Sequence, residues 1–382
     1  MSMLIDPKTK KSLLNLLSGL EKPIKSRGFP AGFYDSAVKI SLNQSLQRGF
    51  LLKYVLVDIM GFPCAYQPIE KVAWEIDFVF NGTHCTVSSE KFGYRLYIRS
   101  KDRKIISRLS NQLPLIFNKA VLLLQKHLET FSASEIEKGD IIIVNQYKEL
   151  FDMYTFFKRQ AQRKRNLRNI KTKEKDFAKS WNTGIKAGRE SFYFEQAAYF
   201  AFFGLLEHLL VLLLAFRNFN PKAESIKKFI FLKWSEKYKR IFNLIDGQFN
   251  EYYMFLVKLS RQNRNLYAHG KFSKDNSSML VYLAGTGLIS AKPFNFNDNA
   301  DAPLFRWLGG SGESFQKLDK FLQLLTEHID FKVSMQIIRG GLNIDFSPKE
   351  RREYKKLMHS GDASEFVEHT NDLIDRYQNM DW

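Results

Sequence analysis

The sequence predicts an α+β protein in which an all-α C-terminal bundle follows a small mixed α/β domain. Two patterns predict this class: period-two alternation of apolar residues over 72–80, and long stretches of helical spacing after residue 190. The 382 residues are enough for one large or two ordinary domains, and 45% hydrophobic with 26% charged residues is the composition of a folded protein. We therefore expect domain boundaries near residues 150, 190 and 332.

The N-terminal segment, 1–150, contains the clearest strand pattern of the chain. Val72, Trp74, Ile76, Phe78 and Phe80 alternate with other residues, so one face of this strand is expected to be buried. The Asn-Gly pair that follows at 81–82 favours a tight hairpin turn. The other expected elements are helices at 13–20, 34–60 and 105–131, strands at 83–87 and 94–99, and a short apolar run at 141–144.

The next segment, 151–189, is rich in lysine and arginine and poor in apolar residues, which predicts a basic linker or an exposed helix. Lys164, Arg165 and Arg168 lie in its densest part. Clustered cations are all that non-specific contact with a phosphate backbone requires, so we select these three as candidate RNA contacts. A solvated face or a hinge explains the same composition, and both interpretations stay open.

The third segment, 190–332, has strong helical spacing. We expect helices at 192–216, 225–244, 250–268 and 315–329, with a strand near 279–283. The last segment, 333–382, reads as a C-terminal helical appendage with a final helix near 363–377.

The formal net charge of +18 favours a polyanionic partner: RNA, DNA or an anionic membrane. Nucleic acid is the partner we expect. Cys64 and Cys85 are the two cysteines, too few for a disulfide framework or a cysteine zinc site, which fits a reducing cytoplasm. Residues 1–11 are polar and lack the apolar core of a signal peptide.

One apolar run, 197–216, has the length of a membrane span but carries Glu207 and His208 at its centre. Apolar side chains favour insertion by about 0.3–0.6 kcal/mol each, whereas a central carboxylate costs roughly 3 kcal/mol, so insertion energy does not decide. A helix that is apolar nearly all round also suits the middle of a bundle. We expect a buried helix and no membrane.

The expected helix at 250–268 ends in the sequence Arg-Asn-Leu-Tyr-Ala-His, with Arg264, Asn265 and His269 separated as Arg-Asn-x(3)-His. This segment resembles the signature of the HEPN superfamily (higher eukaryotes and prokaryotes nucleotide-binding), an arginine that is usually followed by a polar residue, with four to six residues between the arginine and a histidine. The resemblance covers roughly 190–330 and implies a helical bundle whose motif lies at the end of one helix, near a long apolar helix with polar residues. The helix at 192–216, with Glu207 and His208, fits that earlier helix.

A second arginine–histidine pair at this spacing, Arg352 and His359, lies in a charged run and lacks the asparagine. Chance supplies about one such pair in a chain of this kind, so the spacing alone is not specific. The helical context therefore distinguishes the first pair, and we interpret the second as coincidental.

The resemblance implies a metal-independent endoribonuclease, with no cofactor, that works as a homodimer with a composite site. His269 has the side chain for general acid or base catalysis, since imidazole titrates near neutral pH. Arg264 offers a fork of donors that matches phosphate, and Asn265 is suited to orient either group. Arg261, one turn earlier, is expected to contact phosphate, while Glu207 and His208 are supporting candidates that could equally be hydrogen-bonded core residues.

The same resemblance implies a toxin or anti-phage defence role in the cytoplasm, with the N-terminal domain as a sensor or regulatory domain whose candidate ligands are a regulatory protein or a nucleotide. Two alternatives stay open. One is a HEPN module that binds nucleotide or RNA without cutting it, and the other is a membrane-associated protein anchored by 197–216. His269 also has a purely structural explanation as a helix C-terminal residue before Gly270.

Overall fold

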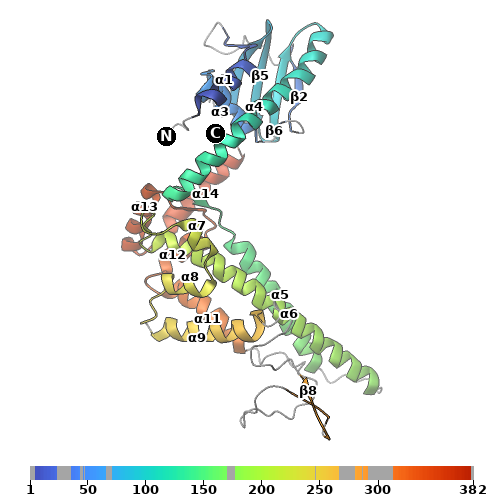
Figure 1. The fold of residues 1–382 in the computed structure, drawn as a ribbon, viewed down its shortest axis with the longest axis vertical. Coiled ribbons are helices and arrows are strands. Elements are labelled where there is room, and N and C mark those ends of the chain that lie inside the picture. The colour runs from blue at the N-terminus through green and yellow to red at the C-terminus, as the bar shows by residue number, and fades with distance from the viewer. Residues whose placement is uncertain are drawn as a thin grey trace. The chain divides into compact units, whose positions relative to one another are not determined.

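The computed structural model describes residues 5–23, 36–43, 46, 48–65, 71–169, 177–245, 247–265, 280–285, 287–290 and 313–379. The chain divides into two compact units, which we call the sheet unit (1–136 with 368–382) and the helical unit (137–367). Because the sheet lies in the N-terminal unit and the later unit is built from helices, the chain is α+β, as predicted (Figure 1).

The sheet unit is built on a six-stranded antiparallel sheet with the order β1-β4-β5-β6-β2, to which β3 adds by pairing with β4. The strands are β1 (Leu20–Glu21), β2 (Val38–Ser41), β3 (Cys64–Ala65), β4 (Val72–Phe80), β5 (Thr83–Glu90) and β6 (Gly93–Arg99). Trp74, Ile76, Phe78 and Phe80 are buried, so the predicted alternation of β4 is confirmed. Asn81 and Gly82 both have positive φ, as the predicted hairpin turn requires.

Helices cover the apolar face of this sheet. They are α1 (Pro7–Leu16), α3 (Gly49–Tyr54) with its π-helical continuation η1 (Val55–Ile59), and α4 (Arg103–Lys138). These helices share a core with β4, β5 and β6, to which α1 contributes Leu13, α3 contributes Leu52 and α4 contributes Phe117. The helix expected over 34–60 is wrong in its first half, because Val38–Ser41 is the edge strand β2 paired with β6.

The helical unit is organised around two antiparallel helices that lie side by side, α5 (Tyr147–Asn169) and α6 (Phe177–Leu213), the latter ending in the 3-10 turn η2 (Leu214–Phe216) (Figure 1). Helix α6 contributes many of the buried apolar residues of this unit, including Phe202, Phe203 and Leu206. Among the described residues one helical stretch, Asn182–Phe216, is long and apolar enough to cross a membrane, and 72% of its most apolar window is buried within the protein. That burial is the property expected of a bundle's central helix.

Shorter helices pack around this pair. They are α7 (Ile226–Phe231), α8 (Trp234–Ile241), α9 (Gly247–Leu259) with the π-helical turn η3 (Ser260–Asn265), α11 (Glu313–Glu327), α12 (Lys332–Arg339) and α13 (Pro348–Ser360). Two small antiparallel pairs join β7 (Ile142–Ile143) to β10 (Ile344–Asp345) and β8 (Leu280–Leu283) to β9 (Gly287–Ser290). Aromatic side chains connect the helices, as where Tyr154 of α5 packs against Phe202 and Phe315 at 5.4 and 6.5 Å between ring centres.

The single helix expected over 225–244 is two helices, α7 and α8, divided at Leu232 and Lys233. Both residues have extended backbone angles, and the Glu236 carboxylate accepts a hydrogen bond from the Lys233 backbone N–H at 3.2 Å, which starts the second helix. The break lets Trp234 pack against Phe203 with 5.4 Å between ring centres.

The predicted domain boundaries differ from the observed units. The boundary at 150 falls inside α5 and the boundary at 332 falls at the first residue of α12. Residues 333–382 are not a simple appendage, because Val333, Met335 and Ile338 of α12 belong to the core of the helical unit. The final helix, α14 (Ser364–Asn379), was predicted, and from Glu368 onward it belongs to the sheet unit.

Asn145 explains why α12 belongs to the helical unit. Its Nδ2 donates to the carbonyls of Ile338 and Leu342 at 2.7 and 2.9 Å, and its Oδ1 caps α5 by accepting from the Tyr147 backbone N–H. One side chain therefore joins the start of α5 to the end of α12.

Candidate functional site at the end of helix α9

The predicted catalytic segment begins in η3, the π-helical turn that follows α9. Helix α9 is anchored by buried Phe249 and Leu256, and the Tyr238 hydroxyl donates to the Phe249 carbonyl at 3.0 Å. Arg264 and Asn265 are the last two residues of η3. The structure describes their backbone but not their side chains, and His269 lies outside the described residues. Single π-turns inside helices are frequent at functional sites, which draws attention to this one.

A hydrogen bond joins this turn to α6. The Gln196 Nε2 donates to the Asn263 Oδ1 at 3.2 Å, and the Asn263 Nδ2 donates in turn to the Leu259 carbonyl at 3.2 Å. Gln196 is 9% exposed, and its Oε1 is buried without a hydrogen-bond partner among the described residues. Because Asn263 directly precedes Arg264, this contact fixes the point on α6 beside which the motif begins.

The residue next to Gln196 is a buried carboxylate. Glu195 is 2% exposed, accepts a hydrogen bond from the Tyr199 hydroxyl at 2.7 Å and forms an ion pair with the Arg165 guanidinium at 3.1 Å. Burial, and then the charge of Glu195, raises the pKa of Tyr199, so the hydroxyl stays protonated and acts as a donor. Arg165, Glu195, Gln196, Tyr199 and Asn263 form what we call the polar cluster of α6.

The cations that were predicted to contact RNA have different surroundings in the structure. Arg165 belongs to the polar cluster, and Lys164 forms an ion pair with Glu190 at 2.5 Å. Arg168 lies near the end of α5, where its side chain is outside the described residues. Arg261 is exposed in η3, at the predicted position one turn before Arg264. Two of the three cations chosen on α5 are therefore matched by glutamates of α6.

Glu207 and His208 do not join the polar cluster. They lie 11 and 12 residues beyond Gln196, and about 1.5 Å of rise per residue places them roughly 16–18 Å farther along α6. Glu207 lies 3.6 Å from the Lys237 ammonium, and the His208 Nε2 accepts a hydrogen bond from the Gln146 backbone N–H at 3.0 Å. Burial lowers the pKa of His208, which favours the neutral imidazole that this acceptor role requires. These contacts fit the structural alternative that the sequence left open for both residues.

The sequence contains a pattern by which the missed residues Glu195 and Gln196 could have been found. Glu195 and Gln196 are two consecutive polar residues inside the helical run that begins at Phe192. Gln196 contacts Asn263 of the turn in which the motif begins, whereas Glu207 was chosen for its central position. Among the described residues, no three His, Cys, Asp or Glu side chains gather closely enough to hold a metal ion.

An open cavity of about 770 Å³ lies at the far end of α6, lined by residues that include Arg217, Arg240 and Asp330. The Arg217 guanidinium stacks on the Phe331 ring at 4.0 Å, and burial lowers the pKa of Arg217. Arg240 is held by Glu224 through two hydrogen bonds. The two arginines of this cavity thus contact protein side chains, and the cavity lies some 20 residues beyond Gln196 along the chain. We therefore do not include it in the site.

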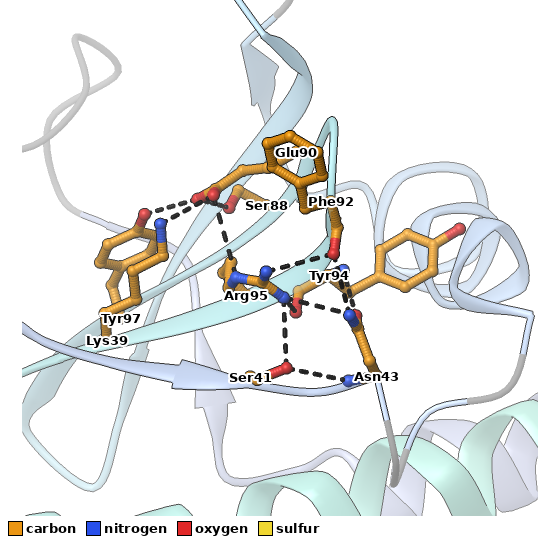
Figure 2. A network of polar contacts seen from close by, with 9 residues as sticks. All are labelled: Lys39, Ser41, Asn43, Ser88, Glu90, Phe92, Tyr94, Arg95 and Tyr97. Carbon is orange, nitrogen blue, oxygen red and sulfur yellow. Dashed lines mark hydrogen bonds and ion pairs between the residues drawn. The ribbon is translucent and has the colours of Figure 1, made fainter. Parts of the chain in front are cut away.

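The sheet unit contains a separate polar network around Glu90, shown in Figure 2. The Glu90 carboxylate accepts from the Tyr97 hydroxyl at 2.5 Å and from the Lys39 ammonium at 2.8 Å. Asn43 closes the adjacent turn by donating to the Phe92 carbonyl and accepting from the Tyr94 backbone N–H, both at 2.9 Å. Each of these polar groups is satisfied by a neighbour, so the network holds strands β2, β5 and β6 together.

Replacing Glu90 by glutamine should alter the acid stability of the sheet unit. Burial alone would raise the pKa of Glu90, but the hydrogen bonds from Lys39 and Tyr97 outweigh it and hold the pKa below its ordinary value of 4.5. A carboxylate with a lowered pKa stabilises the fold above about pH 4.5, and this contribution is lost as the pH falls through the folded-state value. We expect Glu90→Gln to lower the melting temperature at pH 7, and the difference from wild type to shrink below about pH 4.5 in thermal unfolding. A difference that stays constant from pH 7 to pH 3 would contradict this.

Comparisons of the chain with models of protein families, with curated proteins and with solved structures found no match.

Proposed function

We propose that this protein is a metal-independent endoribonuclease of HEPN type. The observation that carries the proposal is the Gln196–Asn263 hydrogen bond, because it joins the start of the Arg264–Asn265–His269 motif to a buried polar cluster on the long apolar helix. A motif at the end of one helix beside the polar residues of an earlier apolar helix is the arrangement that the HEPN resemblance implies. The spacing of Arg264 and His269 and the asparagine between them supply the rest of the support.

The proposed reaction is cleavage of RNA by its own 2′-hydroxyl. A base removes the 2′-OH proton, the 2′-oxygen attacks the adjacent phosphorus, and the P–O5′ bond breaks as the departing 5′-oxygen receives a proton. His269 serves as the general acid or base, Arg264 neutralises charge that develops on the phosphate oxygens, and Asn265 orients one of these groups. The products are a 2′,3′-cyclic phosphate and a 5′-hydroxyl.

One arginine and one histidine are few groups for a reaction with both a base step and an acid step. A two-fold homodimer that places both motifs across its axis doubles the set of catalytic groups. We therefore propose that the active form is a homodimer. From the HEPN resemblance we also propose a toxin or anti-phage defence role in the cytoplasm, with the sheet unit as the sensor or regulatory part.

The direct test is the chemistry of the products. Purified full-length protein is incubated with total cellular RNA in excess EDTA, and new ends are mapped with a ligase that requires a 5′-hydroxyl. We expect 5′-hydroxyl ends paired with 2′,3′-cyclic phosphates, absent when His269→Ala protein is used. RNA that is bound but left intact would replace this proposal with a non-catalytic binding module, and cleavage that needs a divalent metal or leaves 5′-phosphates would refute it.

A further inference from the structure

The first half of α6 has an exposed polar face. Five exposed residues follow one another there at intervals of three or four: Lys179, Asn182, Lys186, Arg189 and Tyr193. Residues at this spacing lie along one side of a helix. We call them the α6 stripe, and the 14 steps from Lys179 to Tyr193 correspond to about 21 Å at 1.5 Å per residue.

The opposite side of α6 packs against α5. Ala187 and Ser191 are buried there, and the Ser191 hydroxyl donates to the Ala161 carbonyl at 2.8 Å. Residues 187 and 191 lie about half a turn from 189 and 193, so the α6 stripe points away from α5. The two helices run side by side at this contact (Figure 1).

The charge of the α6 stripe is positive. It carries Lys179, Lys186 and Arg189, and the neighbouring carboxylate of Glu190 is engaged by Lys164 of α5 at 2.5 Å. The Tyr193 side chain, 57% exposed, follows Arg189 by one turn. Cations that track a phosphate backbone beside an aromatic ring on which a base can stack are the two components of single-strand recognition.

The α6 stripe leads to the candidate site. Gln196, which holds Asn263 of η3, follows Tyr193 by three residues and therefore lies one turn farther along α6. Arg261 is exposed in the same π-helical turn as Asn263. A chain of phosphates lying on the α6 stripe would thus reach the segment that begins with Arg264.

We propose that the α6 stripe is the binding surface for single-stranded RNA that delivers the strand to the motif, an inference that rests on the proposed function. Lys186 and Arg189 contact consecutive phosphates, and Tyr193 stacks on a base next to the site. This assigns RNA contact to the exposed side of α6, in place of Lys164 and Arg165, whose charges are matched by Glu190 and Glu195.

The test uses full-length His269→Ala protein, so that the RNA stays intact, and a fluorescent unstructured RNA of about 12 nucleotides in EDTA. Binding is measured by anisotropy over about 50–300 mM KCl, because each phosphate contact on a single strand contributes about 0.7 to the slope of log affinity against log salt. Adding Lys186→Glu and Arg189→Glu should weaken binding at least tenfold and lower the slope by about 1.4. Adding Tyr193→Ala instead should weaken binding several-fold without changing the slope.

The matched control is Lys349→Glu with Arg352→Glu on α13. These two residues are also exposed, are also three residues apart, and their substitution changes the charge by the same amount. We expect the control to bind RNA within about twofold of the parent at moderate salt. Circular dichroism and melting temperature confirm that each variant is folded.

Three outcomes overturn the inference: no RNA binding by the parent, equal losses in the α6 and α13 variants, or binding of phosphatidylserine vesicles but not RNA through Lys186 and Arg189. Cleavage by the wild-type protein, assayed in parallel, tests the proposed function separately. Salt-sensitive binding through the α6 stripe without any cleavage would leave the inference standing and remove the proposed function. Cleavage by the wild-type protein together with undiminished RNA binding by the α6 variant would leave the proposed function standing and remove the inference.

Discussion

Replacing Arg264 or His269 by alanine is expected to lower the rate of RNA cleavage by about 10³-fold or more. A positioned acid or base contributes about 10²–10⁴-fold to such a reaction, and an arginine that meets developing phosphate charge has an effect of similar size. Because each chain of the proposed dimer supplies the same two groups, one substitution alters both halves of the composite site. The rate is measured with a defined RNA at saturating protein, so that weakened binding does not appear as lost chemistry.

The chain supplies a control for this experiment. Arg352 and His359 have six residues between them, within the spacing of the motif, and both are exposed on α13. Arg352→Ala with His359→Ala should leave the rate unchanged. Undiminished cleavage by Arg264→Ala and His269→Ala, or an equal loss in the α13 control, would show that the motif is not the active site.

The sheet unit was predictable where one face of a strand is buried. The alternation over 72–80 follows from burial of Trp74, Ile76, Phe78 and Phe80 against the helices, and the hairpin follows from the positive φ that Asn81 and Gly82 tolerate. The edge strand β2 was missed because it has only four residues, three of them exposed, so the alternation of Val38 and Ile40 with polar residues is too short to identify a strand. Its pairing with β6 depends on hydrogen bonds that composition does not reveal.

Helix α5 illustrates the limit of hydrophobic patterns. Its sequence is polar enough to suggest a linker. The buried residues Tyr154 and Ala161 nevertheless anchor the helix, because α6 provides the apolar surface against which they pack. The Tyr154 hydroxyl and the Lys158 ammonium both bind Asp319 of α11, at 3.0 and 2.8 Å. Helix formation here depends on tertiary contacts, which outweigh local composition.

The candidate site was predictable only in part. The motif could be read from local spacing, but its neighbour on α6 depends on a contact between Gln196 and Asn263, which are 67 residues apart. A single sequence offers no measure of which polar residue of a long helix faces which turn. Glu207 was therefore selected and Glu195, which lies 12 residues and more than three turns of helix earlier, was missed.

Replacing Glu195 by alanine is expected to lower the free energy of unfolding of the helical unit by about 2–4 kcal/mol. This is the largest stability loss that we expect from substitution of one buried polar residue. The carboxylate is 2% exposed and accepts from Tyr199, whose buried hydroxyl would lose this acceptor. Arg165 would lose its partner as well, but its side chain is 23% exposed and can turn toward water, which moderates the loss. The change is measured by urea unfolding monitored by circular dichroism.

Glu190→Ala is the matched control, because Glu190 lies five residues earlier on α6 and its ion pair with Lys164 is partly exposed. Salt and water screen such a pair, so the control should lose only a small part of the stability that Glu195→Ala loses. Glu195→Gln keeps an acceptor for Tyr199 and should fall between the two. If Glu195→Ala and Glu190→Ala proved equally stable, the polar cluster would not be a fixed part of the bundle.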